Sequence, residues 1–165
     1  MPGSVNSPHH NDNRNYDYSA FPVEERDEYA IIAGLIRENS TVVDLGCGNG
    51  SLMKLLRSKK SCTCTGVELA PTGVDRTREK GFEVIQAPID QQLPFEENQF
   101  DYAICNVTIQ MVMYPEILLK EMKRIAKYQI ISFPNFGFYK NRLDLLLNGR
   151  MPIATLFSYT WYSTG

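Results

Sequence analysis

The sequence predicts an α/β fold in which a parallel sheet is covered by helices on both of its faces. Short strand-like apolar runs alternate with amphipathic helical stretches along the chain, and right-handed crossovers between parallel strands place helices on both faces of a sheet. A glycine-rich turn directly follows the first strand-like run. The 165 residues have the length of one ordinary domain, so we expect a single globular unit.

The first predicted element is a helix that follows a polar N-terminal segment. Residues 1–19 are rich in Asn, Ser, Pro and Asp and poor in aliphatic residues, a composition that does not repay the entropy of ordering. We therefore expect a flexible tail over residues 1–22 and one domain over residues 23–165. Within residues 24–38 apolar side chains recur at spacings of three and four, which predicts an amphipathic helix that Asn39 can end.

Strands and helices then alternate along the rest of the chain. The predicted strands cover residues 41–45, 62–69, 83–86, 101–106 and 128–133. The predicted helices cover residues 52–57, 71–80, a stretch that begins at Pro115, and 141–147. Proline in the first turn and glycine after the last turn are the expected helix boundaries, and Gly81 closes the second of these helices.

Composition and charge exclude several classes of protein. The net charge is −2 and the isoelectric point about 5.7, which does not favour a nucleic-acid partner. The chain has no apolar run near the ~20 residues of a membrane span and no secretory signal pattern, so we expect a cytoplasmic protein without membrane insertion. We expect four reduced cysteines and no metal site, because Cys62 and Cys64 are only two positions apart and His9 and His10 lie in the polar tail.

The stretch "VVDLGCGNGSL" places Gly46, Gly48 and Gly50 between a predicted strand and a predicted helix. Glycine accepts positive φ and lets another group approach the backbone, so this stretch predicts a tight turn with an open face. Ligands of open α/β sheets lie outside the carboxyl ends of the strands. The N-terminus of the helix that follows favours a negatively charged group.

The spacing of this motif narrows the choice of ligand. A dinucleotide motif needs glycine where Ser51 stands, and the phosphate-loop ending is absent. Glu68 follows Gly50 by 18 residues, at the end of the second predicted strand, where a carboxylate can accept hydrogen bonds from both ribose hydroxyls. NAD and S-adenosylmethionine share that ribose. A capping role for Asp44 and a solvated strand end for Glu68 are the structural alternatives.

Several strings resemble a known family. "VVDLGCGNGSL", "GVEL", "LPFEENQFDYAICN" and "PEILLKEMKRI" are similar to class I S-adenosylmethionine-dependent methyltransferases. "DYAIIAGLI", "VIQAPIDQQL", "SFPNFGFYKNRLDLLLNGRMP" and "YTWYST" resemble, more closely, the MetW family of methionine biosynthesis. The resemblance covers nearly all of residues 27–164. It implies a three-layer Rossmann-like fold with sheet order 3-2-1-4-5, in a chain that stops before the sixth and seventh strands of the family.

The resemblance also implies the residues of a cofactor site. Asp44 and the backbone of the glycine loop face the methionine part of S-adenosylmethionine, and Glu68 holds the ribose. Pro88 stands where the superfamily places an acidic adenine contact, so Asp90 is the candidate for that role. The full set of expected cofactor-binding residues is Asp44, Gly46, Cys47, Gly48, Gly50, Glu68, Leu69, Asp90 and Asn106. Tyr16, Tyr18 and Phe21 are candidates for a lid over the cofactor.

The sequence leaves three functions open. The first is methyl transfer from S-adenosylmethionine to a small-molecule acceptor, with S-adenosylhomocysteine as product. The second is a non-catalytic partner of a homoserine O-acyltransferase, which the MetW resemblance implies, and the third is a domain that binds no cofactor. No catalytic acid or base is identified, and a homodimer through the C-terminal edge is a further expectation. The candidates for an acceptor pocket are Asn135, Tyr139, Lys140, Arg142 and Arg150.

Overall fold

The computed structural model describes residue 18 and residues 26–135 and 137–149. The predicted tail, apart from Tyr18, therefore lies outside the described residues, as do Tyr16, Phe21 and Arg150. The elements in chain order are α1 (Asp27–Leu35), β1 (Thr41–Leu45), α2 (Ser51–Lys60), β2 (Thr63–Glu68), α3 (Pro71–Glu79), β3 (Glu83–Gln86), β4 (Phe100–Asn106), the 3-10 helix η1 (Ile109–Met111), α4 (Pro115–Ile125), β5 (Ala126–Ser132) and α5 (Tyr139–Asn148).

The five strands form one parallel sheet in the order β3-β2-β1-β4-β5. The predicted fold class and strand order are therefore confirmed. The strand β1 lies between β2 and β4. On one side of β1 the sheet continues through β2 to β3, and on the other side it continues through β4 to β5. Such a switch point is where an open α/β sheet forms its ligand site, at the carboxyl ends of the central strands.

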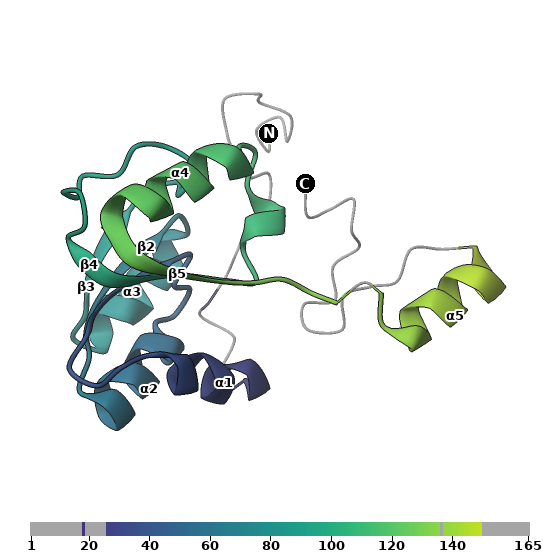
Figure 1. The fold of residues 1–165 in the computed structure, drawn as a ribbon, viewed down its shortest axis with the longest axis horizontal. Helices are drawn as coiled ribbons and strands as arrows, with labels where there is room; N and C mark the ends of the chain where they lie inside the picture. Colours follow the sequence, from purple (N-terminus) through teal and green to yellow (C-terminus); the bar gives the residue numbers. More distant parts are fainter. Residues whose placement is uncertain (1–17, 19–25, 136, 150–165) are drawn as a thin grey trace, which may run out of the picture.

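Two hydrophobic clusters hold the three layers together, one on each face of the sheet. One cluster joins buried residues of α1 and α2, including Ile32 and Leu56, to one face. The other joins α4 to the opposite face through Leu118, Met122 and Ile125, each 0% exposed. Figure 1 shows α4 on one side of the sheet and α1 and α2 on the other. The central strand β1 is thus buried on both faces from Val42 to Leu45, as expected in a parallel sheet that is covered on both sides.

Most element boundaries differ from the prediction by one to three residues, and two of these shifts involve a buried apolar residue. The first helix ends at Leu35 rather than at residue 38, because Ile36 turns into an extended conformation (φ −98°, ψ 134°) and its side chain, 2% exposed, packs into the core. The last strand begins at Ala126, directly after α4. At both boundaries the apolar residue is buried, since Ile36 is 2% and Ala126 1% exposed, and Ala126 pairs with Phe100 in the sheet.

The C-terminal part of the described chain leaves the body of the domain. β5 is an edge strand, and α5 lies well beyond its end (Figure 1). Leu146 and Leu147 of α5 are 79% and 71% exposed. None of the helices in the described ranges is both long enough and apolar enough to cross a membrane.

Candidate functional site

The glycine loop joins β1 to α2 at the carboxyl edge of the sheet, and its three glycines all have positive φ (82°, 56° and 74°). Two of them are required by contacts within the protein. A Cβ on Gly46 would lie 2.8 Å from the side chain of Thr108, and a Cβ on Gly50 would lie 3.0 Å from Oγ1 of Thr77. Gly48 faces a different neighbour, the ring of Tyr18. The loop is therefore closely packed on three sides.

The amide groups of the glycine loop donate hydrogen bonds within the protein. Gly46 N and Cys47 N both donate to the carbonyl of Val67, at 2.8 and 3.1 Å, and Gly50 N donates to Cys47 O at 2.9 Å. Gly48 N donates to Oε2 of Glu68 at 2.7 Å. These four amides therefore have partners within the protein, and the expected negatively charged group at the N-terminus of α2, which begins at Ser51, stays a prediction.

Two carboxylates are buried beside this loop, at the carboxyl ends of β1 and β2. Glu68 is 4% exposed and accepts hydrogen bonds from Gly48 N and, at 2.8 Å, from Ala70 N. Asp44 is 3% exposed, and no donor among the described residues reaches its carboxylate. Burial, and to a smaller extent the charge of Glu68, raises the pKa of Asp44 from 3.8 to about 7.

These two acids fit a positively charged ligand. The buried carboxylate of Asp44, which no donor among the described residues reaches, is costly unless a cation or a hydrogen-bond donor joins it. S-adenosylmethionine carries a sulfonium, an ammonium and a carboxylate group, so its net charge is positive, and it has no phosphate. The loop, Asp44 and Glu68 are brought together as the sequence predicted, and their role toward a cofactor stays a prediction.

Leu69 and Asp90, two further expected cofactor residues, lie in different settings. Leu69 is 37% exposed at the end of β2, where an apolar side chain can contact a base. Asp90 is 3% exposed, and its Oδ2 accepts hydrogen bonds from Met113 N and Tyr114 N at 3.0 and 3.1 Å. This carboxylate therefore holds the chain that enters α4. Its expected contact with adenine remains a prediction.

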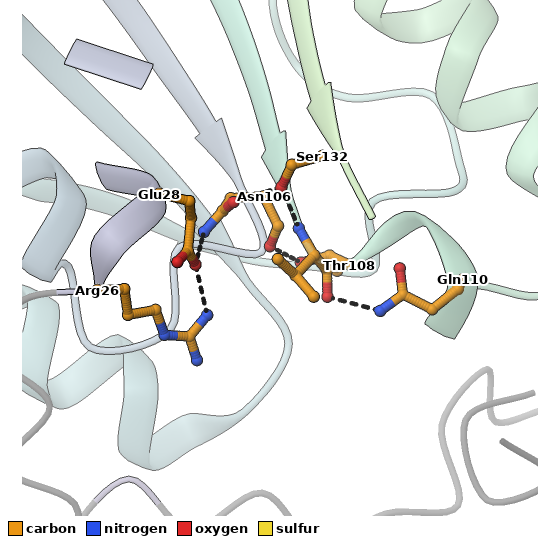
Figure 2. A network of polar contacts seen from close by, with 7 residues as sticks. Arg26, Glu28, Asn106, Thr108, Gln110 and Ser132 are labelled. Atoms are coloured by element: carbon orange, nitrogen blue, oxygen red, sulfur yellow. Dashed lines mark hydrogen bonds and ion pairs between the residues drawn. The ribbon is translucent and has the colours of Figure 1, made fainter. Parts of the chain in front are cut away.

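Asn106, the last residue of β4, is the centre of a polar network (Figure 2). Its Nδ2 donates to Oε1 of Glu28 at 3.3 Å, and the hydroxyl of Ser132 donates to its Oδ1. Arg26 lies 3.5 Å from the same oxygen of Glu28. Asn106 thus links α1 to the ends of β4 and β5, beside the switch point of the sheet.

Gln110, on η1, stands at the other side of this network (Figure 2). Its Nε2 donates to Val107 O at 2.9 Å, whereas its Oε1 is buried and has no hydrogen-bond partner in the described part of the chain. Gln110 and Ser132 were not among the predicted cofactor residues. The available signal was their position after β4 and at the end of β5, at the carboxyl edge where ligands bind.

The candidates for an acceptor pocket form local contacts. Oδ1 of Asn135 accepts from Gly137 N at 3.1 Å, and its carbonyl accepts from Nδ2 of Asn141 at 3.2 Å. Tyr139, on α5, is 65% exposed. None of these contacts brings the segment to the glycine loop in the described chain, so an acceptor pocket there remains a prediction.

The described residues include no histidine and no accessible thiol. All four cysteines are free and buried. Burial raises the pKa of the Cys105 thiol to about 12 and that of Cys47 well above its ordinary value. A thiolate nucleophile is therefore not available at neutral pH.

The chain matches one protein family and several solved structures. The family model described as "Methionine biosynthesis protein MetW" matches residues 26–165. The bifunctional methionine biosynthesis protein MetXA/MetW of Rhodopirellula baltica is 37% identical over 148 residues, covering 84% of this chain and 24% of that protein. The chain thus spans about a quarter of the length of this curated relative.

Two structural neighbours above 25% identity have the same architecture. A SAM-dependent methyltransferase of Thermotoga maritima, described as a possible histamine N-methyltransferase, is 26% identical with a TM-score of 0.59, covering 71% of this chain and 55% of its own. A complex of the Haloferax volcanii Trm112 methyltransferase activator with a putative methyltransferase matches at 27% identity and a TM-score of 0.54, covering 61% and 47%. The chain therefore spans about half the length of these neighbours.

Proposed function

The chain belongs to the MetW family, and on that premise we propose that it binds S-adenosylmethionine and transfers the methyl group to a small-molecule acceptor. S-adenosylhomocysteine would be the product. The proposed cofactor residues are the glycine loop from Gly46 to Gly50, the acids Asp44 and Glu68, and Leu69 and Asp90 near the base. The similarity to a SAM-dependent methyltransferase of Thermotoga maritima supports this proposal.

The observation that carries the proposal is the charge of the site. A dinucleotide places its pyrophosphate against the glycine loop and the first amides of the helix that follows it. In this chain Gly46, Cys47, Gly48 and Gly50 donate to protein oxygens instead. The two buried carboxylates, Asp44 and Glu68, make the same region acidic. A cationic nucleoside without phosphate suits this arrangement better than NAD.

Each acid has a separate proposed role. Carboxylates accept up to about four hydrogen bonds, so Glu68 can bind ribose hydroxyls while it accepts from Gly48 and Ala70. Asp44 is proposed to balance the positive charge of the ligand, which would restore its ionised form. When bound, S-adenosylmethionine supplies an electrophilic methyl group. The protein then contributes alignment of the acceptor and exclusion of water rather than a thiol or histidine nucleophile.

Isothermal titration with S-adenosylmethionine and S-adenosylhomocysteine tests the proposal. We expect saturable binding of both by the wild type and at least ~10-fold weaker binding by Glu68→Gln, because a charge-assisted hydrogen bond contributes about 1.5–3 kcal/mol. Glu83→Gln, at the exposed start of β3, is the matched control and should bind as the wild type does. Circular dichroism shows whether each variant is folded. Failure of the folded wild type to bind either nucleoside would reject the proposal.

A second candidate function is that of a partner of a homoserine O-acyltransferase. The observation that favours it is the relative from Rhodopirellula baltica, in which MetXA and MetW are parts of one bifunctional protein. The family resemblance links MetW to such acyltransferases, and the described residues offer no histidine or thiol for catalysis. Under this function the cofactor would act as an effector of the complex.

Co-expression with the homoserine O-acyltransferase of the same organism tests this second function. We expect a complex that survives size-exclusion chromatography and an acyltransferase rate that changes when the chain is added. Repeating the rate measurement with Glu68→Gln separates an effect of the bound nucleoside from an effect of contact alone. Separate elution of the two proteins together with an unchanged rate would reject the partnership.

A further inference from the structure

The ring of Tyr18 lies on the glycine loop, far from its own place in the sequence. A Cβ on Gly48 would be 3.0 Å from Cε1 and 3.4 Å from Oη of this ring. A Cβ on Gly73, in the first turn of α3, would be 3.1 Å from Cδ2 of the same ring. The ring therefore covers the seam between the loop after β1 and the helix after β2.

The main chain of Tyr18 is fixed at the same place. Tyr18 N donates a hydrogen bond to Oγ1 of Thr72 at 3.1 Å, across a sequence separation of 54. Thr72 directly precedes Gly73 at the start of α3. One residue thus has both its backbone and its ring held by α3 and the glycine loop.

Gly73 shows that this close approach is part of the fold. Glycine is unfavourable inside a helix, yet a Cβ here would lie 2.9 Å from Gly48 O and 2.9 Å from Cγ of Glu68 as well as against Tyr18. The missing side chain lets the loop, the acid and the ring meet at one point. Positive φ is not the reason in this case, because Gly73 lies within α3.

We infer that Tyr18 is a cofactor-binding residue whose ring forms the outer wall of the nucleoside site; this inference rests on the proposed binding of S-adenosylmethionine. Glu68, the proposed ribose acid, accepts from the amide of Gly48, the residue that the ring covers. A ribose held by Glu68 therefore lies next to the ring. An aromatic wall provides apolar contact at a small entropic cost and keeps water from the hydrogen bonds to the carboxylate.

Titration of S-adenosylhomocysteine into Tyr18 variants tests this inference. We expect Tyr18→Ala to bind roughly 10-fold or more weakly and to release the nucleoside faster, whereas Tyr18→Phe keeps its affinity within about threefold, because the ring is the wall. Tyr128→Ala, which removes a half-exposed tyrosine from β5, is the control and should bind as the wild type does. Stopped-flow displacement gives the dissociation rates.

A purely structural role has a different signature. If Tyr18 only stabilised the fold, Tyr18→Ala would lower the ligand-free melting temperature and leave the affinity of the folded protein unchanged. Unchanged or tighter binding by folded Tyr18→Ala, with normal binding by the wild type, would overturn the inference and leave the proposed function intact. Absence of binding by the wild type would overturn both.

Discussion

Replacement of Asp44 by asparagine should change how the stability of the protein depends on pH. The Asp44 carboxylate is 3% exposed, and burial together with the charge of Glu68 raises its pKa from 3.8 to about 7. A group that is harder to ionise in the folded state destabilises that state wherever the unfolded chain is ionised. The asparagine amide keeps the shape of the carboxyl group and removes its charge.

The size of the effect follows from the pKa shift. Each pKa unit corresponds to about 1.36 kcal/mol, so a rise of about three units lowers the free energy of unfolding by about 4 kcal/mol above pH 7. Below pH 3.8 both states hold the proton and the penalty disappears. Stability is therefore lost as pH rises from 3.8 to about 7. Between pH 5 and pH 8 the free energy of unfolding should fall by about 3 kcal/mol because of this group.

Urea unfolding followed by circular dichroism measures this change. Wild type and Asp44→Asn are compared at several pH values from about 5 to 8, and the difference between their unfolding free energies should grow by about 3 kcal/mol in favour of the variant. Using this difference removes the contribution of the titrating groups that do not interact with Asp44. Asp75→Asn, on the exposed side of α3, should follow the wild type. Parallel curves for wild type and Asp44→Asn would refute the shifted pKa.

Two further predictions concern packing and reactivity. Gly46→Ala should lower the free energy of unfolding by roughly 2 kcal/mol or more, because its Cβ would lie 2.8 Å from Thr108 at a φ of +82°. Gly34 lies in α1, and an added Cβ there would have nothing within 4 Å. Gly34→Ala should therefore raise the free energy of unfolding by up to about 1 kcal/mol. Urea unfolding of the two variants measures both changes. The four buried thiols should not react with a thiol reagent in the native protein at about pH 8, and all should react in urea; rapid labelling of native Cys105 would contradict its raised pKa.

The strands and their parallel sheet could be predicted from apolar periodicity, whereas the strand order came from the family resemblance. Residues 42–45 are buried on both faces of the sheet, as the apolar run predicts for a central strand. The ends of the helices were harder to predict from the sequence. Ile36 continues the helical spacing in sequence, yet it leaves α1 to fill the core, and only tertiary packing decides between the two conformations.

The site could be predicted in part for a similar reason. Gly48 and Glu68 have a fixed spacing, and the structure joins them by a hydrogen bond of 2.7 Å. The partner of Asn106 was not predictable, because Glu28 lies 78 positions away and meets it only through the packing of α1 against the sheet. Tyr18 was a candidate for a lid, but no periodic pattern indicated that it would lie on Gly73.

The glycines of the loop and the buried acid Asp44 are present in this fold for different physical reasons. Gly46 and Gly50 are required by the side chains of Thr108 and Thr77, so a domain that binds no cofactor would still need both for its packing. Packing does not explain Asp44. Its environment disfavours the ionised form in the folded state by about 4 kcal/mol, and no donor in the described chain offsets this cost. A cation bound beside Asp44 removes that penalty. The acid, and not the glycines, therefore distinguishes a cofactor-binding domain from one that has only kept the fold.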